Sequence, residues 1–596
     1  MDPSRSRILK TAVSIVIMLA LLAFIGWCAR WRIIAWHLGL PAPGYSVSVQ
    51  KDVMVPMRDG VRLSADIYRP SKEGKYPVIL LRTMYGKRNP GHKYSFTGSL
   101  FASQGYVFIV QDVRGKFDSE GEFYPYIYEA GDGHDTIEWA GTREWSTGKV
   151  GTYGFSYWGS TQWLPAPLRS TYLKAMVPIV TSQDVYPRWI YNGIFRLNDV
   201  LVWHYENAPK RAQSAEGVDW DRAVRTLPLL KADDSLGADI PAYNDWIIHP
   251  SPGPYWDRVR VDDKVAAIQA PALIIDGWYD YYLNLAIDDF KRMKAAGGSD
   301  EARQSVLLVG PWTHASKSKF DDADFGKQAS FMRQVRTILA WFDFWLKGEK
   351  NGILDGGSAR YFTMGANEWR TANEWPPAGT RYTPYYLKSD GGANSAKGDG
   401  ILSETAPGAG KPDSYVADPE NPVPSVGGTS IFGKLKAGPF DQREVESRED
   451  VLVYTTAPLE SDIEVTGPVR LVLYASSSAR DTDFAVKLAE VRPDGTSVNV
   501  QSAVYRASNR ESLKKPALLE KDRVYRFEID AGNTSMLFKK GHRIRLQIAG
   551  SNFPEYGRNL QTGEDNGTTV KTEKARQTVF HDRARPSHLV LPVMRR

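Results

Sequence analysis

Apolar runs alternate with helix-like segments between residues 44 and 352 of the chain. Tyr45–Met54 and Val61–Tyr68 alternate apolar and polar positions, which predicts two strands joined by a turn at residues 58–60. Continuous apolar runs predict further, buried strands at Tyr76–Leu81, Tyr106–Gln111, Val150–Phe155, Ala175–Val180, Ala272–Ile275 and Ser305–Val309. Helical patterns fall at Asp132–Ala140, Tyr157–Leu168 and Phe331–Lys347. Buried strands that alternate with helices indicate a mostly parallel sheet covered on both faces.

Two regions depart from this alternation. Asp184–Leu230 is helical and rich in aromatic residues, which predicts a helical cap inserted into the α/β unit. After residue 352 the pattern changes to many short strands with turn signals, which predicts an all-β sandwich or jelly roll. We therefore divide the chain into residues 1–43, an α/β unit in two parts (44–182 and 265–352), a cap (183–264) and an all-β region (353–596).

The N-terminal segment contains Thr11–Cys28, an uncharged run of 18 residues. Its length falls within the range of a membrane-spanning helix, roughly 17–25 residues, and exceeds the roughly 7–15-residue core of a cleavable signal. Basic residues before the run favour an N-terminus on the inside. We therefore expect a membrane anchor, with the rest of the chain outside the cytoplasm, either periplasmic or extracellular. The alternative is secretion after cleavage of a signal.

Composition narrows the classes of function. Lys and Arg number 75 against 69 Asp and Glu, and the net charge of +6 includes no basic run of the nucleic-acid-binding type. Nucleic-acid binding is therefore not expected. The single cysteine, Cys28, excludes a disulfide framework within the chain and a Cys-rich zinc site.

The strongest local signal for chemistry is the segment Gly154-Phe155-Ser156-Tyr157-Trp158-Gly159. It follows a predicted strand and opens a predicted helix, which is the setting of a nucleophile elbow. The usual elbow has glycine two residues after the serine, whereas in this chain that glycine comes three residues after it. The alternative role for Ser156 is that of a helix N-cap in an ordinary strand-to-helix turn.

A nucleophilic serine needs a base, and the base needs an orienting acid. His314 is the histidine that follows a late predicted strand of the α/β unit. Asp276 and Asp280 both follow the strand predicted before that one, and position alone favours neither as the acid. Two groups are candidates for the oxyanion hole: the backbone N–H of Tyr157, which follows the serine, and the hydroxyl of Tyr85 after an early strand.

These motifs, in this order, resemble those of the CocE/NonD hydrolases, which include cocaine esterases, glutaryl acylases and X-Pro dipeptidyl-peptidase-like enzymes. The resemblance runs from about residue 45 to the C-terminus. Its marks are Met54–Leu63, Gln111–Gly115 with Ser119–Gly121, the G-x-S-Y-x-G elbow at Gly154–Gly159, Gly277–Asp280 and Gly310–His314. The family's own elbow has its second glycine three residues after the serine, which accounts for the position of Gly159.

The resemblance implies an α/β-hydrolase fold with a helical cap and a C-terminal jelly roll of the galactose-binding-like type. Ser156 would be the nucleophile, Asp280 the acid and His314 the base, with Tyr85 and the N–H of Tyr157 in the oxyanion hole. Three cap and loop aromatics would line the acyl pocket: Trp189, Trp203 and Tyr282. The implied substrate is a small ester or amide, with no metal and no organic cofactor.

Three hypotheses for function follow. The first is a carboxylic-ester hydrolase that works through an acyl-enzyme on Ser156. The second is an X-Pro dipeptidyl-peptidase or acylase; a peptidase needs a pocket carboxylate for the α-ammonium group, and Asp184, Asp199 and Glu206 are the cap residues that could supply it. The third, of another class, is a catalytically silent envelope protein that binds carbohydrate through the all-β region.

Overall fold

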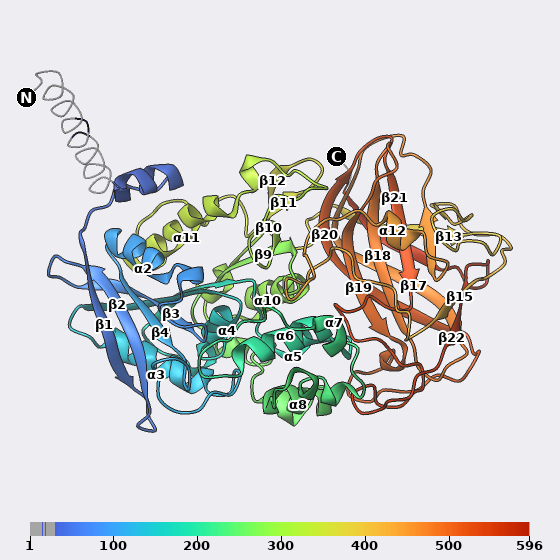
Figure 1. The fold of residues 1–596 in the computed structure, drawn as a ribbon. Coiled ribbons are helices and arrows are strands. Elements are labelled where there is room, and N and C mark those ends of the chain that lie inside the picture. The colour runs from blue at the N-terminus through green and yellow to red at the C-terminus, as the bar shows by residue number, and fades with distance from the viewer. Residues whose placement is uncertain (1–14, 16–17, 19–29, 595–596) are drawn as a thin grey trace, which may run out of the picture.

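The computed structural model describes residues 15, 18 and 30–594. One sheet of ten strands organises the first part of the chain, and one of eleven strands organises the second. Figure 1 shows the α/β part on the left, the all-β part on the right, and the helices of the cap between and below them.

The ten-stranded sheet runs in the order β1-β2-β4-β3-β5-β6-β9-β10-β11-β12. Its strands are β1 (Val47–Pro56), β2 (Arg62–Pro70), β3 (Tyr76–Thr83), β4 (Val107–Asp112), β5 (Ser146–Phe155), β6 (Leu173–Ile179), β9 (Leu273–Tyr279), β10 (Val306–Thr313), β11 (Ala359–Thr363) and β12 (Glu368–Ala372). Pairing is parallel from β4 through β11 and antiparallel at both edges. The parallel strands β4, β9 and β10 are buried along their whole length, as their continuous apolar runs predict.

Helices cover both faces of this sheet: α2 (Tyr94–Ser103), α3 (Glu129–Gly141), α4 (Tyr157–Trp163), α10 (Leu283–Ala296) and α11 (Gln334–Phe342). Adjacent residues of β5 identify the two faces, because successive side chains of a strand point to opposite sides. A Cβ at Gly151 would lie 2.6 Å from Phe342 of α11, whereas Thr152 donates a hydrogen bond to Gln162 of α4 at 3.0 Å. Close packing of α11 therefore requires glycine at position 151.

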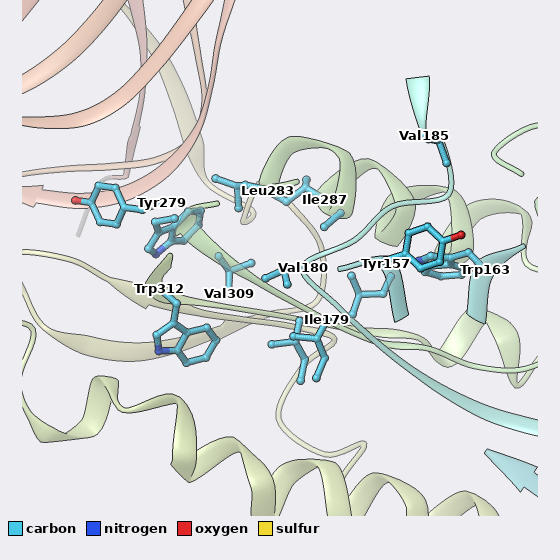
Figure 2. Close-up of a cluster of buried hydrophobic side chains, with 14 of the residues drawn as sticks. Tyr157, Trp163, Ile179, Val180, Val185, Tyr279, Leu283, Ile287, Val309 and Trp312 are labelled. Carbon is cyan, nitrogen blue, oxygen red and sulfur yellow. The ribbon is translucent and has the colours of Figure 1, made fainter. Parts of the chain in front are cut away.

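The carboxyl ends of the central strands rest on a cluster of buried apolar side chains. Figure 2 shows Ile179 of β6, Tyr279 of β9, and Val309 and Trp312 of β10 together with Leu283 and Ile287 of α10. All six are at most 4% exposed to solvent. This packing fixes the strand ends, and with them the loops that follow each strand.

The segment between β6 and β9 forms the cap. It consists of α5 (Tyr186–Trp189), a hairpin of β7 (Ile190–Tyr191) and β8 (Ile194–Phe195), and the helices α6 (Leu197–Asn207), α7 (Trp220–Ala223), α8 (Pro241–Ile248) and α9 (Pro254–Asp257). The sequence pattern predicts helix across residues 190–195, whereas the structure has a hairpin there. Asn192 and Gly193 both have positive φ, 50° and 75°, which is the requirement of a type I′ hairpin turn.

His204 in α6 is a buried histidine that makes stability depend on pH. Its Nδ1 lies 2.8 Å from the carbonyl oxygen of Val200, and burial lowers its pKa from 6.5 to about 4. The folded chain therefore keeps the imidazole neutral down to about pH 4, whereas the unfolded chain protonates it below about pH 6.5. Between pH 7 and pH 5 this group should lower the free energy of unfolding by about 2 kcal/mol.

Urea unfolding at pH 7 and pH 5 measures this effect. Wild type should lose more stability between the two pH values than the variant His204→Gln, which has no imidazole to protonate. Equal losses in the two proteins would contradict the assignment of this pH dependence to His204.

The second sheet runs β15-β22-β17-β23-β13-β14-β16-β21-β18-β19, with β20 paired to β17. Its strands are β13 (Thr380–Lys388), β14 (Ile401–Ser403), β15 (Asp413–Ala417), β16 (Val451–Thr455), β17 (Ile463–Ser477), β18 (Asp483–Val491), β19 (Ser497–Arg506), β20 (Tyr525–Phe538), β21 (Arg543–Ala549), β22 (Ala575–Phe580) and β23 (His588–Met594). The first two strands after residue 352 behave differently. β11 pairs in parallel with β10, so β11 and β12 extend the first sheet rather than the second.

The prediction of an N-terminal membrane anchor is corrected by the structure. Among residues 15, 18 and 30–594, no helix has the length and apolar character needed to cross a membrane. Residues 30–38 are helical. Within this helix Trp31 packs on Phe96 of α2, with ring centroids 5.5 Å apart. The run Thr11–Cys28 itself lies outside the described residues apart from Ile15 and Met18, and the membrane-anchored localisation is withdrawn.

Candidate active site

Ser156 occupies a sharp turn between β5 and α4. Its backbone has φ 54° and ψ −122°, a conformation that L-amino acids rarely adopt. The turn is held on both sides: the Ser156 N–H donates to the carbonyl of Ile179 at 2.9 Å, and the Ser156 carbonyl accepts from Gly159 and Ser160. A strained serine fixed between a buried strand and a helix has the backbone geometry of a nucleophile elbow. Ser156 occupies the N-cap position of α4, but its side chain makes no capping hydrogen bond to that helix.

The position of the second glycine has a physical cause. A Cβ at Gly159 would lie 2.4 Å from Thr181, just beyond β6, so this position must be glycine for α4 to approach the sheet. Two residues after the serine, Trp158 packs instead on Tyr94 and Tyr85, with ring centroids 4.8 and 6.2 Å apart. Close approach to the sheet is therefore required at Gly159, whereas position 158 has room for the largest side chain.

The structure distinguishes the two candidate acids. β9 extends to Tyr279, so Asp276 lies within the strand and Asp280 directly follows it. Nδ1 of His314 lies 2.6 Å from Oδ2 of Asp280, and Oδ1 of Asp280 accepts the N–H of Tyr282 at 2.6 Å. Asp276 instead accepts the N–H of Gly277 at 2.7 Å, and burial, followed by the nearby Asp280, raises its pKa well above its usual range. Asp280 is therefore the carboxylate that is paired with the imidazole.

Two candidate hydrogen-bond donors follow neighbouring strands of the sheet: Tyr157 directly after Ser156 and β5, and Tyr85 after β3, which pairs with β5. The N–H of Tyr157 is the first of α4, and a helix supplies no internal partner for its first N–H groups. The hydroxyl oxygen of Tyr85, two residues beyond β3, accepts the indole N–H of Trp203 at 3.1 Å. That contact leaves the Tyr85 proton available for another acceptor. Burial raises the pKa of Tyr85, so its phenol stays protonated and can donate at neutral pH.

The three predicted pocket aromatics converge on a fourth aromatic residue, Tyr126. Trp189 donates to the Tyr126 hydroxyl at 3.3 Å, and Trp203 lies 5.0 Å from Trp189, centroid to centroid. Tyr126 also stacks on Tyr157 at 4.7 Å, and its hydroxyl interacts with Tyr282. Residues from the serine turn, the cap and the acid loop therefore form one continuous aromatic wall.

Sequence reasoning did not identify three residues of this region: Tyr126, Arg188 and Tyr281. Tyr281 stacks on the His314 imidazole, with centroids 4.4 Å apart and ring planes at 27°. Arg188 is 1% exposed, and its guanidinium carbon lies 3.4 Å from the Tyr281 ring centroid. The position of Tyr281 beside Asp280 was the available signal for that residue. Nothing in the sequence around Arg188 indicates that its charge is buried.

The sheet brings these groups to one edge. Ser156 follows β5, Asp280 follows β9 and His314 follows β10, and these strands run parallel through β6. The carboxyl ends of parallel strands share an edge of the sheet, which is where open α/β sheets carry their ligand sites. A serine on a strained turn, an Asp–His pair and two N–H or O–H donors at one edge supply the groups needed for acyl transfer through a serine ester.

Comparison with known families agrees with this class of enzyme. Residues 59–316 match the X-Pro dipeptidyl-peptidase (S15 family), and residues 351–590 match the X-Pro dipeptidyl-peptidase C-terminal non-catalytic domain. The fold class predicted from the sequence is thereby confirmed: an α/β-hydrolase-type catalytic part followed by an all-β C-terminal part.

Individual relatives narrow the assignment. The chain is 37% identical to the cocaine esterase of Rhodococcus sp., over 92% of this chain and 99% of that protein. Among solved structures, an aminopeptidase of a marine sediment Thaumarchaeota archaeon matches with a TM-score of 0.81 at 26% identity, covering 93% of this chain and 98% of that one. An α-amino acid ester hydrolase matches with a TM-score of 0.80 at the same identity and coverage. The chain belongs to the CocE/NonD and S15 family of serine hydrolases, and it is a serine hydrolase of ester or amide bonds.

Proposed function

We propose that the protein is a carboxylic-ester hydrolase in which Ser156 is the nucleophile, His314 the general base and Asp280 the acid that orients it. The observation that carries this proposal is the 2.6 Å contact between Asp280 Oδ2 and His314 Nδ1, on the sheet edge where Ser156 sits on a strained turn. With Nδ1 bound to the carboxylate, Nε2 is the imidazole nitrogen left to exchange a proton with the serine and the leaving group.

The reaction proceeds in two acyl transfers. The Ser156 hydroxyl oxygen attacks the ester carbonyl while His314 takes its proton, and the oxyanion accepts hydrogen bonds from the Tyr85 hydroxyl and the Tyr157 N–H. Collapse releases the alcohol, which receives the proton from His314, and leaves an acyl ester on Ser156. Water, deprotonated by the same imidazole, then attacks this ester and releases the carboxylic acid.

Charge in the aromatic wall supports an ester substrate over a peptide. The buried guanidinium of Arg188 lies 3.9 Å from the ring of Trp189 and 5.3 Å from that of Tyr282. An α-ammonium group held between those two aromatics would face a like charge at low dielectric. Of the three cap carboxylates, Asp199 is already paired with this guanidinium at 3.5 Å. Asp184 accepts a hydrogen bond from its own loop, at the N–H of Tyr186.

One carboxylate favours the alternative of an amide or amino-acid ester substrate. Glu206 of α6 is close enough to Tyr85 to raise the pKa of that phenol, and its own pKa is raised by burial. A substrate ammonium group placed beside Tyr85 could pair with Glu206. The similarity to an aminopeptidase and to an α-amino acid ester hydrolase gives this alternative its weight.

Substrate preference separates the two alternatives. Turnover should be measured with p-nitrophenyl butyrate and benzoate, with alanine p-nitrophenyl ester, and with Ala-Pro-p-nitroanilide, in wild type and Glu206→Gln. We expect the plain esters to have the highest kcat/KM and Glu206→Gln to leave their kcat/KM within about threefold. A higher kcat/KM for the ammonium-bearing substrates, lost in Glu206→Gln, would overturn the ester assignment.

Removal of the Tyr85 hydroxyl tests the oxyanion role. Tyr85→Phe keeps the ring and its packing but deletes the donor, and loss of one oxyanion-hole donor costs about 10²–10³-fold in kcat. We expect a loss of this size in kcat with KM nearly unchanged, because the bond forms mainly in the transition state. A fall in kcat of less than about fivefold would exclude Tyr85 from the oxyanion hole.

A further inference from the structure

A buried chain of contacts runs from the all-β part of the molecule to the imidazole of His314. It begins at Ser430, in the loop between β15 and α12 (Arg443–Glu446), and passes through Asp199 and Arg188 of the cap to Tyr281 beside the acid. Each of these four side chains is at most 5% exposed. None of them is required by the acyl-transfer steps themselves.

Tyr281 is held between two flat groups. On one side its ring stacks on the His314 imidazole at 4.4 Å between centroids, and on the other the guanidinium carbon of Arg188 lies 3.4 Å from its centroid. The Arg188 guanidinium is itself backed by the Trp189 ring at 3.9 Å. A planar cation between two aromatic faces is a favourable arrangement, and it restricts the tilt and translation of the Tyr281 ring.

The positive charge of Arg188 is balanced by the carboxylate of Asp199. Its Nη2 lies 3.5 Å from Oδ2 of Asp199, and Oδ1 of Asp199 accepts the hydroxyl hydrogen bond of Ser430. Asn198, beside Asp199, donates to the hydroxyl oxygen of Ser430 at 3.3 Å and to the carbonyl of Phe432 at 2.8 Å. A buried guanidinium without a counter-ion would be strongly unfavourable, so Asp199 and the loop that orients it keep Arg188 in place.

We propose that Arg188 is a positioning residue for His314, which it holds in its working orientation through Tyr281, and that Asp199 and Ser430 hold Arg188. The all-β part, which matches a domain described as non-catalytic, would then support the general base through this chain of contacts. The proposal rests on the proposed function, in which His314 is the general base. The acyl-transfer steps alone give Arg188 no role, and the proposal assigns it one.

The same arrangement has an electrostatic consequence. A cation behind Tyr281 disfavours a second positive charge on His314, and the anion Asp199 partly cancels that effect. The other ionisable groups around this stack are Asp280 and Tyr282 at the imidazole, Arg196 at 5.7 Å from the Tyr281 ring, Glu555 as the counter-ion of Arg196, Tyr126 beside Tyr282, and Asp276 beside Asp280. Substitutions at Arg188 and Asp199 that change charge alone leave all of these in place.

Two substitutions should therefore move the pH profile of kcat/KM in opposite directions. Arg188→Gln removes a cation, so the imidazole protonates more easily and the acid limb should move to higher pH, by up to about one unit. Asp199→Asn removes the compensating anion, so the acid limb should move to lower pH. Arg188→Lys keeps the charge but loses the planar stack, so it should leave the limb in place and lower kcat by about three- to tenfold.

The measurement is the pH dependence of kcat/KM for p-nitrophenyl butyrate in the full chain. Arg506→Gln is the matched control, because Arg506 also joins the all-β part to the cap, through the Gly193 carbonyl at 3.1 Å, but does not contact Tyr281. It should leave the acid limb unmoved. Ser430→Ala changes no charge and tests the proposal if a charge variant does not fold. It should lower kcat about two- to fivefold with KM unchanged.

Opposite shifts for Arg188→Gln and Asp199→Asn, with an unmoved control, would support the proposal. Unmoved limbs, shifts in the same direction, or an unchanged kcat in Ser430→Ala would overturn it. Failure of the proposed function is seen separately: it would appear as full activity in His314→Ala, whatever the Arg188 variants do.

Discussion

Replacement of Ser156 by alanine is expected to lower kcat for p-nitrophenyl esters by about 10⁴-fold or more, with KM changed little. The alanine keeps the turn but removes the oxygen that forms the acyl-enzyme. In other serine hydrolases, loss of the nucleophilic serine removes nearly all of the catalytic triad's contribution to kcat. The residual rate should come from the oxyanion donors and substrate binding alone. Steady-state kinetics together with a mass measurement for trapped acyl-enzyme, after rapid quench, provide the readout.

A neighbouring serine supplies the matched control for this prediction. Ser160 lies one turn along α4, where its hydroxyl pairs with that of Thr181 at 3.0 Å. Ser160→Ala should therefore change stability slightly and leave kcat within about threefold. If Ser156→Ala retained more than a tenth of the wild-type kcat, the nucleophile would have to be another residue.

Replacement of Asp280 by asparagine should produce the second-largest loss, about 10⁴-fold in kcat. An asparagine amide carries no negative charge. Even where its oxygen accepts the Nδ1–H bond from His314, it cannot stabilise the imidazolium that forms in the transition state. Asp276 provides the comparison within the same strand and loop. Because Asp276 lies within β9 and accepts the N–H of Gly277, whereas Asp280 is the carboxylate bound to the imidazole, Asp276→Asn should reduce kcat less than about tenfold.

The pair of variants decides between the two carboxylates that the sequence leaves open. Kinetics at pH 7.5 should be accompanied by circular dichroism, because Asp276 is fully buried and its substitution can cost stability. A large loss in Asp276→Asn with an intact fold, and a small one in Asp280→Asn, would exchange the roles of the two carboxylates.

The sequence predicted the parts of the structure that depend on local pattern. Continuous apolar runs marked the parallel strands, and the glycines at 154 and 159 marked the elbow, because close packing of strand and helix leaves no room for a Cβ there. Strand length was harder to judge. The run Ala272–Ile275 continues as β9 to Tyr279, and that extension of a few residues is what separates Asp276 from Asp280.

Other features depend on long-range contacts that no local pattern shows. The strand β11 looked like the start of the all-β region, yet its pairing with β10 places it in the first sheet. The hairpin at Asn192-Gly193 was hidden within an aromatic-rich helical pattern, although the dipeptide itself is a turn signal. Arg188 resembles any surface arginine in sequence, and its burial becomes visible only where cap, acid loop and all-β loop meet.

Labelling of the intact protein by a fluorophosphonate tests the central claim most directly. The probe reacts with a serine only where a base activates it and an oxyanion site accepts the phosphonyl oxygen. We predict one adduct per chain, located on the peptide that contains Ser156, with labelling lost in Ser156→Ala and strongly slowed in His314→Ala. A well-folded protein that is not labelled, or an adduct on a different serine, would contradict the account.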